Sequence, residues 1–165
     1  MREALRGSEE ALAELFRMTW PGAYRAAFLI VHDHSAAEDI AQEALVAAIR
    51  NLDRFDRRRP LRPWLHRIVV NRAIDWTRVR TLRAEVFDAD AKGEDDAGAP
   101  RYSDPVVAAL AELPPDQRAV VVLRHLLEYT PGEIARMLEL PRGTVNSRLR
   151  RGLDVLKARL EGETR

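Results

Sequence analysis

The sequence predicts an all-α protein built from two small helical domains joined by a flexible acidic linker. Apolar residues recur at the three- and four-residue spacing of amphipathic helices over most of the 165 residues, and prolines and capping residues divide this pattern into about eight helices. Between residues 81 and 103 the periodicity fails and acidic residues gather with Ala and Gly. We therefore expect domains at 1–80 and 104–165, with 81–103 as the linker.

Composition excludes several classes of protein. The chain has no Cys, which rules out disulfides, thiolate metal sites and a cysteine nucleophile. No apolar run approaches the roughly 20 residues that cross a bilayer, and the N-terminus lacks the apolar core of a signal peptide. The net charge is only +1, but the basic residues lie mainly outside the linker. We expect a cytoplasmic protein without membrane insertion and without a cofactor.

The first domain begins with two predicted helices. Ser8 is a suitable N-cap for a helix reaching about Met18, and Pro21 would open a second helix ending near Val31. Residues 32–34 (His-Asp-His) then read as a polar turn. Two imidazoles could hold a metal ion, but no third ligand is suggested, so a plain loop is the preferred interpretation.

The third predicted helix carries two faces. Ser35 and Glu38 have the spacing of a capping box at its start, and its apolar stripe would pack in the core. A second stripe, at i, i+3, i+4 and i+7, consists of Asp39, Gln42, Glu43 and Val46. It reads either as a solvated face or as a docking surface for a basic partner helix, with Val46 as an apolar contact.

A basic loop and a fourth helix follow. Residues 54–63 contain five arginines and two prolines, so they cannot form a buried helix and would attract phosphates. Pro63 would open a helix to about Arg78, with Arg67 and Asn71 on a polar stripe. Basic groups, an amide and aromatic rings are the elements of a single-stranded nucleic-acid surface. Trp64 and Trp76 can equally be core residues.

The second domain starts at Asp104 and Pro105, which cap and open a helix with Val106, Val107 and Leu110 facing inward. A longer helix runs from Pro115 to about Leu127. The apolar run 119–123 within it could pass for a strand, but the preceding proline and the continuing pattern favour a helix.

The last two predicted helices form a helix-turn-helix. Thr130 and Glu133 make a capping box at the start of the first, and Pro141 ends the turn. The inward positions of the second are Val145, Leu149, Leu153, Leu156 and Leu160. The outward positions are Thr144, Ser147, Arg148 and Arg151. Hydroxyl and guanidinium groups on an exposed helix suit the major groove of DNA. Residues 136–159 hold seven basic side chains and two acidic ones, which argues against a merely solvated last helix.

Two other classes of function fit the sequence less well. A DNA-binding regulator of the response-regulator type also ends in such a helix-turn-helix, but residues 1–80 show no βα alternation and no acidic phosphorylation pocket. A helical hydrolase or metal enzyme would need a nucleophile–base pair, clustered ligands or a glycine-rich phosphate loop, and the sequence offers none. We therefore expect no catalytic residues, no metal site and no small-molecule substrate.

Taken together, the motifs resemble those of bacterial RNA polymerase sigma factors of the extracytoplasmic-function (ECF) group, in the sigma-70 family. The resemblance rests on four motifs in the family's order: residues 37–43 (AEDIAQE) followed by Phe55, 63–75 (PWLHRIVVNRAID), 113–118 (LPPDQR) and 143–148 (GTVNSR). It spans nearly the whole chain. It implies the minimal two-domain form, with a four-helix region 2 at 1–80 and the helix-turn-helix of region 4 at 104–165.

The resemblance also implies a role for each surface. The stripe Asp39, Gln42, Glu43 and Val46 would dock on the clamp helices of the polymerase β′ subunit, and the second domain on the β flap. The −10 element would be melted and held by Arg57, Arg58, Arg59, Arg62, Trp64, Arg67 and Asn71. The −35 element would be read by Arg142, Thr144, Asn146, Ser147, Arg148 and Arg151.

Further partners follow from the same resemblance. The linker would occupy the RNA exit channel, and an anti-sigma factor is an expected partner besides core polymerase and promoter DNA, both duplex and melted. Many relatives carry Arg or Lys where this chain has Asn146, so one contact to the −35 element is expected to be missing.

Overall fold

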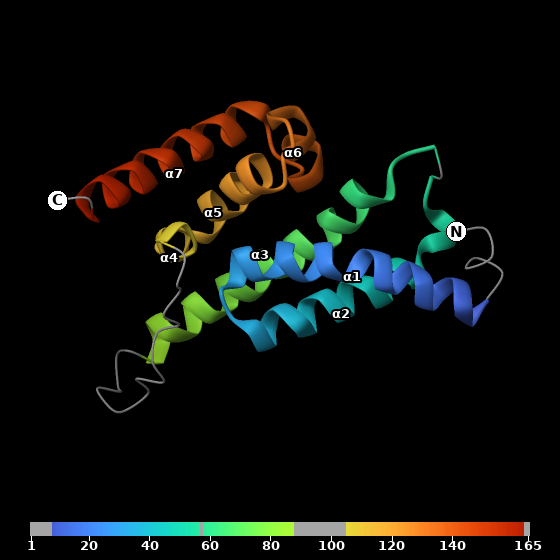
Figure 1. Cartoon of the computed structure of the whole chain (residues 1–165). Coiled ribbons are helices and arrows are strands. Elements are labelled where there is room, and N and C mark those ends of the chain that lie inside the picture. Colours follow the sequence, from blue (N-terminus) through green and yellow to red (C-terminus); the bar gives the residue numbers. More distant parts are fainter. Residues whose placement is uncertain (1–7, 57, 88–104, 164–165) are drawn as a thin grey trace.

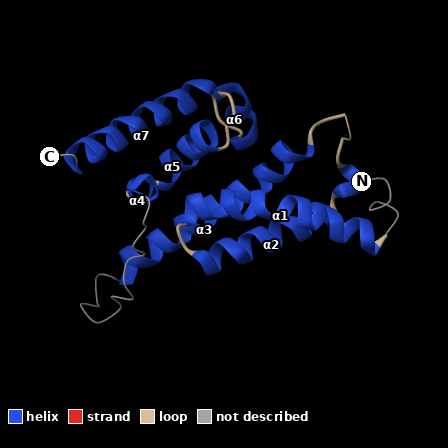
Figure 2. Cartoon of the chain, in the orientation of Figure 1, coloured by secondary structure: helices blue, strands red, loops and turns tan. Residues whose placement is uncertain are grey.

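Two groups of helices make up the structure (Figure 1). The computed structural model describes residues 8–56, 58–87 and 105–163. In that part of the chain the elements are α1 (Glu9–Val31), α2 (His34–Arg50), the 3₁₀ turn η2 (Leu52–Arg54), α3 (Leu61–Phe87), α4 (Pro105–Ala111), α5 (Pro115–Val121), the π-helical turn η3 (Val122–Leu126), α6 (Pro131–Leu138) and α7 (Arg142–Glu163). The described residues contain no strand (Figure 2), which confirms the all-α prediction.

Helix α1 is continuous where two helices were predicted on either side of Pro21. An interior proline removes a backbone hydrogen bond and crowds the preceding turn, at a cost of about 3 kcal/mol. However, aromatic rings at four-residue spacing run past this point. Phe16 stacks on Trp20 with ring centroids 5.2 Å apart, and Trp20 stacks on Tyr24 at 6.4 Å. Because α1 also packs against α2 and α3, we attribute its continuity to side-chain packing that outweighs the proline.

Helix α2 begins at His34 with Asp33 as its N-cap, so the capping box predicted at Ser35 is wrong. The Asp33 carboxylate accepts a hydrogen bond from the Ala36 backbone N–H at 2.9 Å, and its negative charge suits the positive end of a helix. The preceding residue, His32, ends α1 in the left-handed conformation with φ of 54°. The predicted polar turn is therefore a two-residue connection between helices.

Helix α3 is longer than predicted at both ends, since it begins at Leu61 and not Pro63, and continues past Arg78 to Phe87. Val79 and Leu82 continue a helical spacing beyond Arg78, but both side chains are exposed, so these turns do not pack in the core. The Thr81 hydroxyl donates to the Thr77 carbonyl at 3.0 Å in this extension. The first part of the predicted linker is thus helical, and residues 88–103, like the predicted cap Asp104, lie outside the described part of the chain.

The second group of helices packs around α5. The apolar run 119–123 is helical as predicted, and all five of its side chains are buried, which is why it shows no periodicity. The helix widens into a π-turn at η3, where the Leu127 N–H donates to the Val122 carbonyl at 3.0 Å, five residues back. Leu110 of α4 is buried as predicted, whereas Val106 is exposed.

Helix α7 lies against α5 along a stripe that includes Val145, Leu149 and Leu156. Gly152 belongs to the same stripe, and a Cβ added there would lie 2.8 Å from Val121 Cγ2, so the two helices approach closely at this point. Leu153 was predicted to face inward, but it is 40% exposed. At about 100° per residue it lies roughly 80° around the helix from Val145, at the edge of the contact.

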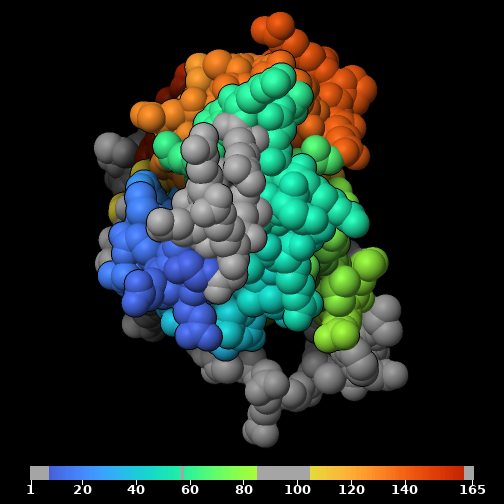
Figure 3. Space-filling view, turned by 90° about the vertical axis from the view of Figure 1, so that its right-hand side faces the viewer, coloured from blue at the N-terminus to red at the C-terminus, as the bar shows by residue number. Residues whose placement is uncertain are grey.

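The two groups of helices also pack against each other. Helix α3 contacts α5 and α6, and α1 contacts α4 and α5. One continuous cluster of buried apolar residues includes members from both groups. In Figure 3 the green segment between α2 and α3 meets the orange residues of the C-terminal helices. The surfaces predicted to bind different ligands therefore lie near one another in this structure.

Candidate nucleic-acid and partner interface

Helices α6 and α7 form the predicted helix-turn-helix. The capping box is present: the Thr130 N–H donates to Glu133 Oε2 at 2.7 Å, and the Glu133 N–H donates to Thr130 Oγ1 at 3.3 Å. Hydrogen bonds from the Thr130 backbone and hydroxyl stabilise the carboxylate and lower the pKa of Glu133. Between the helices Glu139 adopts a φ of 54°, and the Leu140 N–H donates to the Ala135 carbonyl at 2.9 Å. These bonds hold α7 at a defined angle to α6.

The outer face of α7 carries most of the groups predicted to contact the −35 element. Exposed or half-buried on this helix are Arg142, Thr144, Asn146, Ser147, Arg148 and Arg151. Arg148 departs from the predicted outward direction, because its Nη2 lies 3.1 Å from Asp116 Oδ2 and its side chain is half-buried. It stands three residues after Val145 and four before Gly152, so it borders the packed stripe. A carboxylate of α5 thus partly neutralises this arginine.

The acidic stripe predicted for partner docking lies on one face of α2. Asp39, Gln42, Glu43 and Val46 are all exposed, and Val46 keeps 39% of its surface accessible. Glu43 Oε2 accepts from Arg72 Nη1 of α3 at 2.8 Å, in an exposed ion pair. The stripe presents carboxylates, an amide and one apolar side chain to solvent. This is the chemistry expected for contact with a basic helix.

The basic loop precedes α3 and is organised by Asp56. Its Oδ1 accepts from the Arg58 backbone N–H at 3.0 Å, and Oδ2 lies 3.7 Å from Arg59 Nε. The side chains of Arg58, Arg59 and Arg62 are exposed. Arg57, which was also predicted to contact the −10 element, lies outside the described residues.

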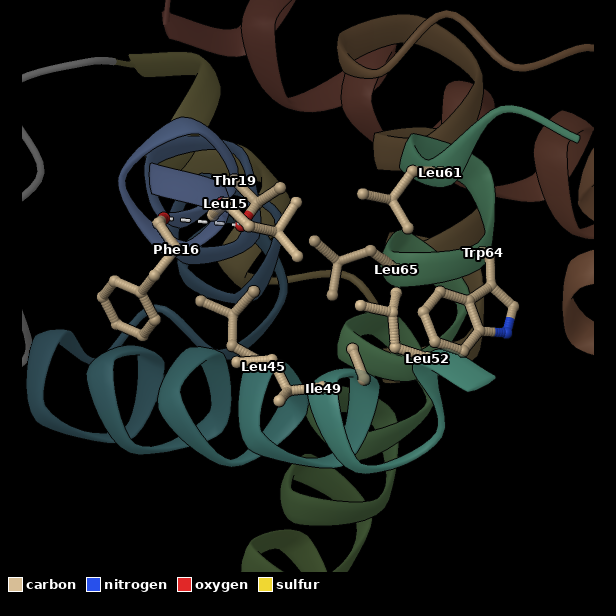
Figure 4. Close-up of a pocket in the computed structure, with 10 residues that line it drawn as sticks. Leu15, Phe16, Thr19, Leu45, Ile49, Leu52, Leu61, Trp64 and Leu65 are labelled. Carbon is tan, nitrogen blue, oxygen red and sulfur yellow. Dashed lines mark hydrogen bonds between the residues drawn. The ribbon is translucent and has the colours of Figure 1, made fainter. Parts of the chain in front are cut away.

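Trp64 lies at the edge of the core of the first group of helices and is half-buried. It packs on Phe55 with ring centroids 4.8 Å apart and helps to close an apolar seam between α1, α2 and α3 (Figure 4). The seam is lined by Leu15, Phe16, Thr19, Leu45, Ala48, Ile49, Leu52, Leu61, Trp64 and Leu65. Trp64 is therefore partly a core residue, as the sequence allowed, and the rest of its half-buried ring is accessible. Trp76 is also half-buried, with the Arg80 guanidinium 5.2 Å from its ring centroid.

A cleft of 620 Å³ separates the basic loop from α6. Its lining residues are Arg54, Phe55, Asp56, Arg59, Pro60, Pro63, Trp64, Arg67, Glu133, Arg136 and Met137. Four arginines and two carboxylates thus line a space bordered by aromatic rings. The cleft can accommodate an anionic and partly aromatic ligand, the chemistry of a nucleic-acid base with its phosphate.

Arg67 and Asn71 lie one turn apart on α3, as predicted. Asn71 is exposed, and Arg67 Nη2 hydrogen-bonds Glu139 Oε1, at the turn between α6 and α7. A residue predicted to contact melted DNA is therefore engaged by the helix-turn-helix in this structure.

Two buried polar contacts between the helix groups were missed by sequence reasoning. The Tyr129 hydroxyl lies 2.8 Å from His66 Nδ1, and His66 is only 2% exposed. Arg118 of α5 is also buried, and its guanidinium donates to the Ile30 carbonyl at the end of α1 and lies 3.3 Å from His32 Nδ1. His66 stands three residues before Val69 and four before Val70, which are both buried, so the apolar face of α3 could have signalled its burial. No local signal pairs it with Tyr129.

Burial keeps both imidazoles neutral. Burial and, as the second cause, the adjacent Arg118 guanidinium lower the pKa of His32 to about 4. Burial likewise lowers the pKa of His66 to about 4, with Arg62 as the second cause. Burial raises the pKa of Tyr129. At neutral pH the tyrosine can therefore donate to an uncharged imidazole nitrogen.

The described residues include no group of three or more His, Asp or Glu side chains placed to bind a metal ion. His34 is stacked on Phe28 with ring centroids 4.5 Å apart, and its Nδ1 lies 2.6 Å from the Tyr24 hydroxyl, whereas His32 faces Arg118. Among the helices described, none is long and apolar enough to cross a membrane.

Comparison with known proteins connects these surfaces to a family. Residues 15–83 match the family model for sigma-70 region 2, and residues 103–156 match the model for sigma-70 region 4. The chain is 34% identical to the ECF RNA polymerase sigma factor SigM of Mycobacterium tuberculosis, over 88% of this chain and 74% of that protein. The chain belongs to the ECF sigma factors. It is also 29% identical to the ECF sigma factor SigW of Bacillus subtilis, over 97% of this chain and 94% of SigW.

A solved structure agrees with this assignment of the fold. The sigma factor RpoE, in its complex with the anti-sigma factor NepR from Bartonella quintana, superposes with a TM-score of 0.72 at 24% identity. The match covers 92% of this ECF sigma factor and 98% of RpoE. Sigma factors are non-enzymatic specificity subunits of RNA polymerase, as expected for a chain in which no catalytic constellation was predicted.

Proposed function

We propose that this ECF sigma factor binds core RNA polymerase through α2, recognises the −35 and −10 promoter elements through α7 and α3, and so directs the initiation of transcription. The observation that carries the proposal is the chemistry of three separate surfaces. An exposed acidic stripe lies in the region 2 match, basic and aromatic groups lie beside it, and a basic helix-turn-helix lies in the region 4 match.

Core polymerase would be bound by Asp39, Gln42, Glu43 and Val46. Their exposure on one face of α2 supports docking on the basic clamp helices of the β′ subunit, and the second domain would contact the β flap. Like charges placed in such a contact cost several kcal/mol, so the negative charge of the stripe favours a basic partner and disfavours an acidic one.

The −35 element would be read by Arg142, Thr144, Asn146, Ser147, Arg148 and Arg151. Arg142, Asn146 and Arg151 are exposed, which supports direct contact in the major groove. Arg148 must exchange Asp116 for DNA before it can contribute.

The −10 element would be held in melted form by Arg57, Arg58, Arg59, Arg62, Trp64, Arg67 and Asn71. The cleft of 620 Å³ beside this set supports the proposal, because a flipped base needs a stacking surface and hydrogen-bonding groups. Extruding one base costs only a few kcal/mol, which contacts of this kind can offset.

The division into domains and the remaining partners belong to the same proposal. Region 2 would occupy 1–80 and region 4 would occupy 104–165, with the acidic segment 81–103 entering the RNA exit channel. An anti-sigma factor is a further proposed partner, by analogy with the RpoE complex. The protein would act in the cytoplasm, where RNA polymerase works.

Run-off transcription by core RNA polymerase, with and without this protein, tests the proposal on a pool of genomic promoter fragments. We expect new transcripts whose start sites share two spaced sequence motifs. Duplex DNA shifted without polymerase, and no new transcripts with it, would favour a simple DNA-binding regulator and contradict the sigma function.

A charge-reversal pair tests the docking surface. We expect Asp39→Arg with Glu43→Arg to abolish binding to core polymerase while the chain stays folded. Glu10→Arg with Glu14→Arg is the matched control, because these exposed residues have the same spacing on α1 and give the same change in charge. Equal affinity of both variants for core polymerase would refute the role of the stripe.

A further inference from the structure

The cleft between the basic loop and α6 is built by both groups of helices. Arg54 of η2, Arg59 of the loop and Arg67 of α3 come from the first group, and Arg136 of α6 comes from the second. The volume of 620 Å³ lies within the range of about 300–1,000 Å³ that is usual for small-molecule sites. Four guanidinium groups from separate segments of the chain thus surround a space of the size of a small ligand.

The lining of the cleft carries more positive than negative charge. Its two carboxylates, Asp56 and Glu133, leave a net charge of +2 beside the four arginines. Asp56 accepts a hydrogen bond from the Arg58 backbone N–H at 3.0 Å. Glu133 accepts one from the Thr130 backbone N–H at 2.7 Å. Both carboxylates are therefore held by bonds within their own segments, which they would lose by moving across the cleft to an arginine.

Three of the four arginines offer donors to a ligand. Arg54, Arg59 and Arg136 are exposed, whereas Arg67 hydrogen-bonds Glu139. The ion pair of Arg59 is long, since its Nε lies 3.7 Å from the nearest Asp56 oxygen. A guanidinium presents five N–H donors in a planar fork that matches the oxygens of a phosphate. Guanidinium groups that share one space repel each other, so a bound anion relieves that repulsion.

Aromatic and apolar surface borders the same space. Trp64 lines the cleft and is half-buried, so part of its indole ring is accessible. Packing on Phe55, with ring centroids 4.8 Å apart, fixes the ring. Pro60 and Pro63 add apolar surface. Because every nucleobase has a π-face, any of them can stack on such a ring. The lining therefore combines donors for a phosphate with a surface for a base.

We propose that this cleft is a binding site for a nucleoside monophosphate in the free protein, with the phosphate held by Arg54, Arg59 and Arg136 and the base stacked on Trp64. A phosphate monoester carries a charge of about −1.5 to −2 at pH 7, which matches the net charge of the lining. Binding of the nucleotide does not depend on the promoter function proposed above.

The melted −10 strand has the same chemistry, but its proposed contacts all lie in the first domain. Arg136 of the second domain therefore distinguishes the two ligands. Because Trp64 belongs to both sets, a bound nucleotide and a melted strand exclude each other at this ring.

Isothermal titration calorimetry of the full chain with AMP tests the site. We expect a dissociation constant below about 1 mM. Ribose 5-phosphate keeps the phosphate and lacks the base, so it should bind about tenfold more weakly. Equal affinities for the two compounds would indicate an anion site without base recognition and overturn the proposal. Absence of binding at about 10 mM AMP would also overturn it.

Single charge removals test the arginines. Arg136→Gln should weaken AMP binding about tenfold, because it removes a charged donor to the phosphate. The matched control is Arg124→Gln, which removes the same charge from an exposed site of the second domain outside the cleft. Arg54→Gln and Arg25→Gln form the corresponding pair in the first domain. Equal losses in a variant and its control would attribute the effect to net charge and overturn the proposal.

The indole N–H signals of the three tryptophans in a nuclear magnetic resonance spectrum report where AMP lies. Substitution of each by Phe assigns the signals. AMP should shift the signal of Trp64 more than those of Trp20 and Trp76, which do not line the cleft. A larger shift at Trp20 or Trp76 would place the nucleotide elsewhere and overturn the proposal.

A short oligo-dT separates a free nucleotide from a DNA strand. We expect Arg136→Gln to weaken binding of AMP more than binding of oligo-dT. Binding of oligo-dT without binding of AMP would show that the cleft requires a strand, which overturns this proposal and leaves the sigma function intact. Binding of AMP together with an absence of new transcripts in the run-off assay would refute the sigma function and leave the nucleotide site intact.

Discussion

Replacing Gly152 by alanine tests the close approach of the recognition helix to α5. In an exposed helix interior this change stabilises by about 1 kcal/mol, because alanine has the higher helix propensity. At Gly152 the new methyl group would lie 2.8 Å from Val121 Cγ2, well inside normal contact distance. Overpacking of this kind costs about 1–3 kcal/mol. We therefore expect the free energy of unfolding to fall by about 1 kcal/mol.

Urea unfolding of the full chain, followed by circular dichroism, measures this change. Gly143→Ala is the matched control on the same helix, because no atom lies within 4 Å of its added Cβ, and it should stabilise the protein by about 0.5 kcal/mol. Val121→Ala removes the atom responsible for the overlap. In that background Gly152→Ala should cost less, with a coupling above about 0.5 kcal/mol. Strict additivity of the two changes, or stabilisation by Gly152→Ala alone, would refute the close-packing argument.

Three further predictions concern DNA and pH. Arg148→Ala should weaken binding to a −35 duplex by about 1–3 kcal/mol if the side chain reads a base edge, and an equal loss on scrambled duplex would indicate a phosphate contact. Asn71→Ala should impair promoter opening more than duplex binding, and wild-type permanganate reactivity in the melted region would contradict this. Because the native pKa values of His32 and His66 are about 4 against about 6.5 when unfolded, the unfolded chain binds more protons between these values. Stability should therefore be fully present above pH 6.5 and fall as the pH drops toward 4, by at most about 3 kcal/mol for each histidine. Urea unfolding at pH 7 and pH 5 measures this loss of stability. The His66→Gln variant should lose less than the wild type. Equal losses in the two proteins would exclude His66 as a source.

The helical pattern and the helix-turn-helix were predictable because both depend on local signals. The capping box of Thr130 and Glu133 lies within a single turn, and the apolar stripe of α7 follows the helical repeat. Where the chain offered two competing local signals, the prediction was wrong. Asp33 and Ser35 are both suitable caps for α2, and only the structure shows that Asp33 is used.

Errors of a second kind came from packing that is remote in sequence. Pro21 lacks a backbone N–H and so predicts a helix break. The stacked rings of Phe16, Trp20 and Tyr24 and the contacts of α1 with α2 and α3 nevertheless keep the helix intact. The direction of Arg148 and the burial of His66 depend on residues of other elements, Asp116 and Tyr129. No spacing rule within one helix contains that information.

The π-turn at η3 has a consequence for how the length of this chain can change. A π-turn holds one residue more than the α-helical turn that it replaces, so deleting a residue between Val122 and Leu126 would leave a helix that is still fully hydrogen-bonded. The π-turn and the α-helical turn each complete about one full turn, so the same deletion would leave everything after it in nearly the same orientation relative to α5. Tyr129 would then still face His66, and α6 would meet the first domain with the same face. A one-residue gap at this point would thus conserve both the secondary structure of region 4 and the surface that it offers to region 2.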